Sequence, residues 1–380
     1  MNTMATDKSN KIPNAPNLRF PEFVGEWEED IIGNVAPLQR GFDLPNQNIE
    51  NGEYPVVYSN GILRNHKYYQ CEAPGLVTGR SGSIGNFTYI QEGKYWPHNT
   101  SLWVTNFNGN WPKFIYYLYQ TINIEQYATG SGVPTLNRND VHKHIVSVPP
   151  LVEQKKISEF LSVVDQRIAT QIVAIEKMES LIKGITLSVI NGKGVKKVLL
   201  GELLTERNEK NTDHHEVYSV AVREGVVNQI EHLGRSFSAA DTSHYNVVHH
   251  GDIVYTKSPT GEFPYGIVKR SDVDKCVAVS PLYGVYKPMS DNIAIWLHHY
   301  FDSPISANNY LHKLIQKGAK NTINITNQRF LENYVPIPEN VVLSVYCQAI
   351  DALENKLMLE RELLDAFRQQ KAYLLKNMFV

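Results

Sequence analysis

The sequence predicts an α+β fold that is built twice: two β-rich globular halves, each followed by a long helix, with the two helices packed against each other. Three observations predict this. An apolar stripe runs along residues 149–190, the C-terminal residues 338–380 repeat that stretch, and short β-type runs separated by Gly, Asn and Pro fill the regions between. The predicted segments are therefore 17–148, 149–193, 194–337 and 338–380.

The first long helix begins after Pro149-Pro150 and ends at Asn191-Gly192-Lys193-Gly194, a strong stop signal. Its apolar residues recur at steps of three and four, so they lie on one helical face. The average spacing of about 3.5 residues is typical of a long helix that packs against another long helix. The residues of this seam are Ile157, Leu161, Val164, Ile168, Ile172, Ile175, Met178, Ile182, Ile185 and Val189.

The second helix is found by shifting the numbering by 189 residues. Apolar and acidic positions of the first helix then coincide with matching residues, and both helices share a preceding proline. We interpret this as a duplication; two unrelated amphipathic helices are the alternative. The matches include Pro149 with Pro338, Leu161 with Ile350, Asp165 with Glu354, Ile175 with Leu364, and Val189 with Met378.

The first globular half, residues 17–148, contains β-type runs at 54–58, 75–78 and 101–104, and one helical segment at 113–121. The second half, residues 194–337, begins with Leu200-Gly201 where the first has Ile32-Gly33. The offset between the halves grows from 168 to 189 along the chain, so the second copy has gained loop residues. Loops that diverge on a retained framework are where binding specificity usually resides.

Composition sets limits on the class of protein. The chain has 380 residues, 42% of them hydrophobic, and a net charge of −2, which excludes a small, highly basic nucleic-acid binder but not a large protein with basic groups gathered on one surface. Three cysteines with no metal-site spacing indicate a reducing setting. Since there is no apolar N-terminal region and no run able to span a bilayer, we expect a soluble, cytoplasmic protein.

Motifs for catalysis are missing from the sequence. It has no Gly-x-Gly-x-x-Gly and no phosphate-binding Gly-x4-Gly-Lys-Ser/Thr, and Pro149-Pro150 lacks the flanking residues of an amino-methyltransferase site. The adjacent histidine pairs at 214–215, 249–250 and 298–299 would be poor chelators on a strand, because neighbours there point to opposite faces. We therefore expect no catalytic residue, no cofactor and no metal in this chain.

Turns rich in Gly, Ser, Asn and Arg are the clearest binding candidates. They lie at 39–41, 78–86 and 129–138, with corresponding basic turns at 255–258 and 317–321 in the second half. Arg80 has the side chain best shaped for a bidentate bond to guanine or phosphate. Tight turns with solvated charges are the alternative for any single loop. The predicted nucleic-acid-binding residues are Arg40, Arg80, Ser81, Ser83, Asn86, Ser131, Arg138, Lys257, Ser258, Lys317, Lys320 and Asn321.

The stretch Pro149-Pro150-Leu151-Val152-Glu153-Gln154-Lys155-Lys156-Ile157, continuing to Asp165, resembles the central shared region of the specificity (S) subunits of type I restriction-modification systems. Leu18-Arg19-Phe20-Pro21 with Trp27, and Thr78-Gly79-Arg80 through Gly85, resemble further features of that family. The C-terminal copy departs from the pattern, since Val342-Leu343 stand where the offset places Glu153-Gln154.

The resemblance implies two target-recognition domains related by pseudo-two-fold symmetry and separated by two long antiparallel helices that form a coiled coil. Each domain would read one half of a split site in double-stranded DNA. The helices would dock two modification (methyltransferase) subunits, with restriction subunits as further potential partners. The predicted docking residues are Glu153, Gln154, Ile157 and Leu161.

The resemblance also implies a non-catalytic chain whose partner subunits use S-adenosylmethionine, ATP and Mg²⁺. Two other interpretations remain open from the residues alone. One is a coiled-coil adaptor with two protein-binding heads, and the other is a self-sufficient methyltransferase.

Overall fold

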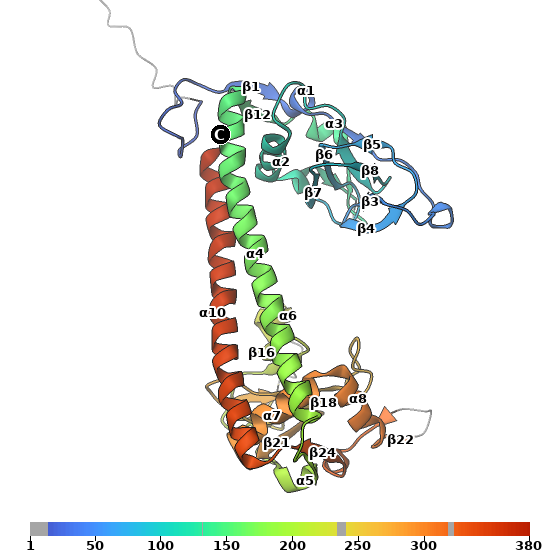
Figure 1. Cartoon of the computed structure of the whole chain (residues 1–380), viewed down its shortest axis with the longest axis vertical. Coiled ribbons are helices and arrows are strands. Elements are labelled where there is room, and N and C mark those ends of the chain that lie inside the picture. Colours follow the sequence, from blue (N-terminus) through green and yellow to red (C-terminus); the bar gives the residue numbers. More distant parts are fainter. Residues whose placement is uncertain (1–13, 131, 234–240, 318–322) are drawn as a thin grey trace, which may run out of the picture. The chain divides into compact units, whose positions relative to one another are not determined.

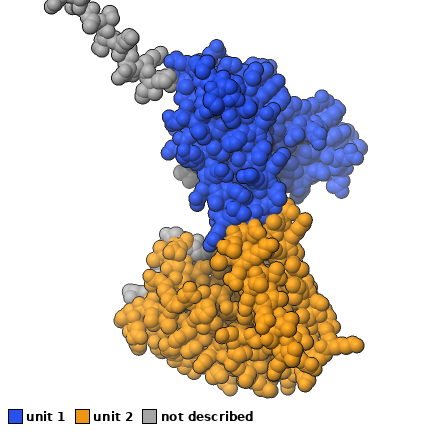
Figure 2. Space-filling model, turned by 60° about the vertical axis from the view of Figure 1, so that its left-hand side comes forward, with its two compact units in different colours: residues 1–172, 362–380 blue, residues 173–361 orange. Residues whose placement is uncertain are grey.

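The computed structural model describes residues 14–130, 132–233, 241–317 and 323–380. Its contacts divide the chain into two compact units, shown in different colours in Figure 2. Unit 1 comprises residues up to 172 together with 362–380, and unit 2 comprises residues 173–361. The division runs through both long helices, so each unit contains part of each, whereas the sequence pattern predicts each helix as a segment of its own.

Unit 1 is built on two four-stranded sheets (Figure 1). The first has the order β2-β9-β6-β7, and all its neighbouring strands are antiparallel. The second has the order β4-β3-β8-β5, in which β3 and β8 are parallel. The strands are β2 (Leu38–Arg40), β3 (Tyr54–Tyr58), β4 (Gly61–His66), β5 (Cys71–Glu72), β6 (Gly75–Gly79), β7 (Phe87–Ile90), β8 (Lys94–Pro97) and β9 (Ser101–Val104).

The remaining elements of unit 1 frame these sheets. A short ribbon pairs β1 (Glu28–Ile31) with β12 (Ile145–Val148), and a second pairs β10 (Ala128–Thr129) with β11 (Thr135–Leu136). The helices are α1 (Ile32–Val35), α2 (Pro112–Thr121), α3 (Arg138–Val141) and the first part of α4 (Leu151–Ile190), with 3₁₀ turns at Asn46–Asn48 and Ile124–Tyr127. The predicted strands at 54–58, 75–78 and 101–104 and the predicted helix at 113–121 are confirmed.

Unit 2 has one four-stranded sheet of order β14-β21-β18-β19 and several two-stranded ribbons. Its strands are β13 (Lys196–Leu199), β14 (Leu204–Glu206), β15 (Tyr218–Ala221), β16 (Gly225–Asn228), β17 (Asn246–Val248), β18 (Ile253–Thr256), β19 (Ile267–Arg270), β20 (Val277–Val279), β21 (Gly284–Pro288), β22 (Gln316–Lys317), β23 (Ile323–Asn324) and β24 (Tyr334–Ile337). Its helices are α5 (Leu200–Leu203), α6 (Gln229–Leu233), α7 (Asp291–Asp302), α8 (Pro304–His312), α9 (Asn327–Phe330), the last part of α4 and the first part of α10 (Asn340–Met378). The last part of α10 belongs to unit 1.

The two units share part of their topology. The order β2-β9-β6-β7 recurs as β14-β21-β18-β19, and the β1–β12 pair recurs as β13–β24. Each pair of terminal strands leads directly into a long helix, α4 or α10. Glu28 at the start of β1 corresponds to Lys196, and Ile145 at the start of β12 corresponds to Tyr334, which confirms the growth of the offset from 168 to 189.

The two long helices run antiparallel. In unit 1, Lys371 Nζ of α10 lies 2.8 Å from Asp165 of α4. In unit 2, Glu179 pairs with Arg361 at 2.7 Å and the Thr186 and Tyr346 hydroxyl oxygens lie 2.9 Å apart, so α10 numbers fall as α4 numbers rise. The predicted seam is confirmed, since all ten of its residues are buried or half-buried. In the part of the chain that the structure describes, no helix is long and apolar enough to span a membrane.

The core of unit 1 joins distant parts of the sequence. Trp27, Phe114 of α2 and Leu161 of α4 pack together with Met378 and Phe379 from the C-terminal end of the chain. The Phe379 ring stacks on Phe114 with centroids 5.3 Å apart and meets Trp27 edge-on at 6.3 Å. The first globular half therefore completes its core with residues from the second long helix.

Candidate nucleic-acid interface

Three of the predicted basic turns meet at one cavity of unit 1. The cavity has a volume of about 620 Å³, and its lining includes Arg40, Arg80 and Arg138. The Leu136 N–H donates to the Arg80 carbonyl at 2.8 Å, which joins the second turn to the third. The first turn reaches the same place at the end of β2, which pairs with β9 and through it with β6.

Two of these arginines have guanidinium groups without a partner among the described residues. The side chains of Arg80 and Arg138 make no hydrogen bond or ion pair with any residue that the structure describes. The backbone of Arg80 is fixed, because its N–H donates to the Thr100 carbonyl at 2.9 Å. Arg40 differs, since its Nη2 lies 3.1 Å from Asp43 Oδ1 at an exposed position. Within the described part of the chain, the cavity thus has two guanidinium groups that no other side chain pairs with.

Glycines shape the turns themselves. A Cβ atom on Gly79 would lie 1.9 Å from the Ser83 carbonyl oxygen, and one on Gly41 would lie 2.2 Å from the His98 carbonyl oxygen. Gly82 and Gly85 have φ of +82° and +85°, which favour glycine. At Gly79 the space beside the Cα is filled by the turn itself, so the turn requires glycine there.

Two histidines contact residues next to the cavity lining. The Leu38 N–H at the start of β2 donates to His142 Nε2 at 2.9 Å. Burial lowers the pKa of His142, and the nearby Arg138 charge lowers it further. The pKa of His98 is also lowered by burial, and its Nε2 lies 3.3 Å from the Leu44 carbonyl oxygen. Neutral imidazoles are therefore part of the arrangement that holds β2 and the Arg40 turn.

The other predicted binding residues are distributed less tightly. In unit 1, Ser81 and Ser83 are half-buried and Asn86 is exposed, all in the Arg80 turn but outside the cavity lining. Ser131 lies outside the described residues. In unit 2, Lys257 is half-buried just after β18, where burial lowers its pKa and Glu206 opposes that shift; Ser258 beside it is exposed. The side chain of Lys317 and the whole of Lys320 and Asn321 lie outside the described residues.

The four predicted docking residues are internal contacts, and the docking prediction is wrong for them. Glu153, Gln154, Ile157 and Leu161 are all buried within unit 1, so they offer no surface to a partner. Arg19 donates from Nε and Nη2 to the two Glu153 carboxylate oxygens, both at 2.8 Å, and Trp27 Nε1 donates to Oε1 at 3.3 Å. The docking residues were implied by the family resemblance, and the sequence does not reveal that these side chains are covered within unit 1.

Gln154 holds the start of α2. Its Oε1 accepts the Trp111 N–H at 2.8 Å, and its Nε2 donates to the Asn110 side chain and the Pro149 carbonyl, both at 2.9 Å. Because Trp111 caps the N-terminus of α2, this glutamine fixes that helix to α4. Glu153 and Gln154 together attach the globular part of unit 1 to the long helix.

A group of possible metal ligands also occurs in unit 2. Among the residues that the structure describes, His298, His299 and Glu354 bring donor atoms close together. The histidines lie on α7, so the argument from strand geometry does not apply to this pair. His298 Nδ1, however, accepts the Arg270 N–H at 3.1 Å. A neutral ring then carries its proton on Nε2, which leaves His298 no free nitrogen for a metal.

Comparison with known proteins places these features in context. Residues 25–177 match the family described as type I restriction modification DNA specificity domain. The structure is similar to that of a type I restriction-modification S subunit from M. genitalium, with a TM-score of 0.61 and 14% identity over 96% of this chain and 99% of that one.

A second similar chain comes from a structure titled for complex assembly and conformational transition of the type I R-M system. It has a TM-score of 0.50 and 12% identity over 93% of this chain and 97% of that one. At these identities the similarity is one of fold. No curated protein sequence matches this chain.

Proposed function

We propose, from the premise that residues 25–177 carry a type I restriction-modification DNA specificity domain, that this chain is the specificity subunit of such a system. In this proposal each unit recognises one half of a bipartite site in double-stranded DNA. The repeated topology of the two units supports the division into two readers. The main support for DNA recognition is that the turns with Arg40, Arg80 and Arg138 line one cavity.

The free guanidinium of Arg80 is suited to reading a base. Arginine can donate two parallel hydrogen bonds to O6 and N7 of guanine in the major groove, and such a pair contributes about 1–3 kcal/mol of discrimination. Arg138, which is exposed, is suited to a phosphate contact. Arg40 shares its charge with Asp43, so it is the weaker anion ligand of the three.

The chemistry of the complex belongs, in this proposal, to other chains. This chain supplies no catalytic group; methyltransferase subunits would bring S-adenosylmethionine, and restriction subunits would bring ATP and Mg²⁺. The exposed apolar residues of the long helices are the proposed docking positions. Val152 is 71% exposed and Val341, at the equivalent place in the second copy, is 77% exposed. Equivalent apolar positions at the start of both helices support two modification subunits per chain.

Substituting Arg80 by alanine tests the proposal. The site is first identified by mapping methylated positions in cells that contain this chain with its partner subunits. We expect Arg80→Ala to weaken binding to that duplex by about 5- to 150-fold, the equivalent of about 1–3 kcal/mol. Tolerance to base changes should rise in one half-site only.

Arg167→Ala is the matched control, because Arg167 is an exposed arginine on α4 away from the cavity. It should leave discrimination unchanged at both half-sites. Equal loss of discrimination in both halves would contradict the role given to Arg80. A protein-binding adaptor would show no salt-dependent affinity for a specific duplex, so titration at several salt concentrations separates the two functions.

A further inference from the structure

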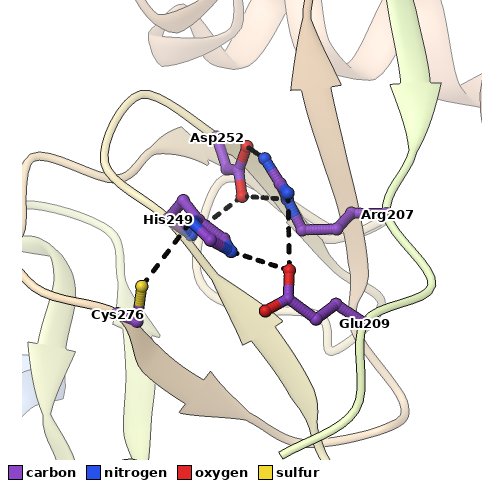
Figure 3. A network of polar contacts seen from close by, with 5 residues as sticks. All are labelled: Arg207, Glu209, His249, Asp252 and Cys276. Carbon is purple, nitrogen blue, oxygen red and sulfur yellow. Dashed lines mark hydrogen bonds and ion pairs between the residues drawn. The ribbon is translucent and has the colours of Figure 1, made fainter.

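A cysteine, a histidine and a glutamate form a connected array in unit 2 (Figure 3). They come from three separate segments: Glu209 follows β14, His249 follows β17, and Cys276 precedes β20. His249 Nε2 lies 2.7 Å from Glu209 Oε2, and Cys276 Sγ lies 3.5 Å from His249 Nδ1. The imidazole therefore lies between a carboxylate and a thiol.

The hydrogen bonds determine the tautomer of His249. A carboxylate can only accept, so the proton of a neutral His249 ring is on Nε2. The lone pair of Nδ1 then faces the Cys276 sulfur. Proton transfer from the thiol to Nδ1 would give a thiolate beside an imidazolium that Glu209 stabilises, the arrangement that activates cysteine nucleophiles in general.

Neighbouring residues hold this geometry. The His249 N–H donates to Asp252 Oδ2 at 2.8 Å. Asp252 is buried and receives two hydrogen bonds from Arg207, at 2.7 and 2.9 Å. Arg207 Nη1 also lies 3.5 Å from Glu209 Oε2. The backbone of His249 and the carboxylate of Glu209 are thus fixed by one arginine.

The three cysteines differ in their surroundings. Cys71 and Cys347 are buried, and burial raises the pKa of Cys71 to about 11 and that of Cys347 to about 12. Cys276 is only half-buried, beside His249 and Glu209 side chains that are 35% and 45% exposed. A small reagent can therefore reach the array, whereas the other two thiols are enclosed and protonated.

We propose that Cys276 is a reactive thiol and a modification site for small electrophiles and hydroperoxides, with His249 as its base and Glu209 as a positioning residue. With a hydroperoxide, the Cys276 sulfur forms an S–O bond as the O–O bond breaks. The sulfur is oxidised by two electrons to a sulfenic acid. The leaving oxygen takes the proton held by His249, which gives water in the case of hydrogen peroxide. This inference does not depend on the proposed DNA-binding function.

Site-resolved alkylation of the full-length chain with iodoacetamide tests the inference. Mass spectrometry of peptides gives the rate at each cysteine at pH 6.5 and pH 9.5. An ordinary thiol is only about 1% thiolate at pH 6.5. We expect His249→Gln to slow Cys276 about tenfold at pH 6.5, since part of the gain in thiolate is offset by lower nucleophilicity. At pH 9.5 the variant and the parent chain should react at similar rates.

Two further variants complete the design. Glu209→Gln should slow Cys276 several-fold at pH 6.5, and His250→Gln, at the neighbouring histidine outside the array, should not. Hydrogen peroxide followed by a sulfenic-acid trap such as dimedone should label Cys276 and neither of the buried cysteines. Equal slowing by His249→Gln at both pH values would show that the histidine only controls access. That result, or a parent chain in which Cys276 reacts no faster at pH 6.5 than in His249→Gln, would overturn the inference.

Discussion

Glu153 is a carboxylate that is 1% exposed in the first turn of a helix, where it binds Arg19 through two hydrogen bonds. The hydrogen bond to Glu153 raises the pKa of Arg19, so the guanidinium remains charged. An acidic group near a helix N-terminus also interacts favourably with the helix dipole. The pair therefore attaches the N-terminal segment of unit 1 to α4.

Glu153→Gln should destabilise unit 1 by about 3 kcal/mol, because removing one partner of a buried ion pair leaves the other without compensation. Glu159→Gln provides the control, since Glu159 is exposed on the same helix. Urea unfolding followed by circular dichroism measures both. If the two variants unfold at the same urea concentration, the Arg19–Glu153 pair does not stabilise the unit.

Three half-buried histidines of unit 1 make its stability depend on pH. Burial lowers the pKa of His98, His142 and His144 in the folded state, so the unfolded chain binds protons more readily. The stabilisation is complete above the unfolded pKa of about 6.5 and is lost as pH falls through the lower folded values. The midpoint of thermal unfolding should therefore decrease from pH 7.5 to pH 5.5.

His142→Gln separates this effect from other titrations. A glutamine oxygen can still accept the Leu38 N–H but cannot be protonated in this range. The slope of unfolding midpoint against pH should become shallower in this variant. A slope equal to that of the parent chain would assign the pH dependence to groups other than His142.

The long helices are the part of the structure that the sequence predicts best. The seam residues follow from a period of about 3.5, and Ile157, Ile175 and Ile182 are buried as that period requires. The cavity was predicted only in part. The three basic turns were identified from composition, yet their meeting depends on the Leu136–Arg80 and Ser81–Thr135 contacts across more than fifty residues. Local patterns carry no information about such pairings.

The Arg207 network was not predicted at all. Arg207 and Asp252 are separated by 45 residues, and neither belongs to a motif. From the sequence, His249 was interpreted only as a member of an adjacent histidine pair, and Cys276 only as an isolated thiol. Their relationship appears only once β17 and β20 pair, since that antiparallel pairing brings residues 249 and 276 together at the ends of the two strands.

The C-terminal end of α10 is predicted to be essential to unit 1. Phe379, which directly follows α10, is 5% exposed and packs on Phe114 and Trp27, whereas Tyr373 within α10 is 61% exposed. Phe379→Ala should lower the free energy of unfolding by about 3–5 kcal/mol, as is usual for removal of a buried phenylalanine, and Tyr373→Ala by less than about 0.5 kcal/mol. Denaturant unfolding of both variants tests this. A small effect of Phe379→Ala would show that unit 1 closes its core without α10.

At the scale of the whole molecule, the two units share a four-stranded sheet but surround its first strand with differently paired arginines. In unit 1 the strand β2 ends at the cavity, where the guanidinium groups of Arg80 and Arg138 pair with no described residue. In unit 2 the corresponding strand β14 leads to Arg207, which is bound by the two oxygens of Asp252. A base-reading role for Arg207 would require breaking both bonds. Under the proposed function, unit 2 would recognise its half-site with other groups, so we expect the two half-sites to differ in sequence.

The continuity of α4 leads to the last prediction: the length of the paired helices sets the gap between the half-sites. α4 has 40 residues, or about 60 Å at about 1.5 Å per residue. Inserting three heptads into both α4 and α10 preserves the seam and adds about 31 Å. That is close to one turn of DNA, about 34 Å or 10 base pairs, so both half-sites would stay on the same side of the duplex.

We expect the mapped methylation site to keep both half-site sequences while the gap between them grows by about nine or ten base pairs. The same insertion in α4 alone has no matching length in α10, so it should abolish methylation rather than move the half-sites apart. An unchanged gap in the doubly extended chain, with methylation retained, would mean that DNA or partner subunits set the spacing. The helices would then serve to join the two readers without measuring the distance between their targets.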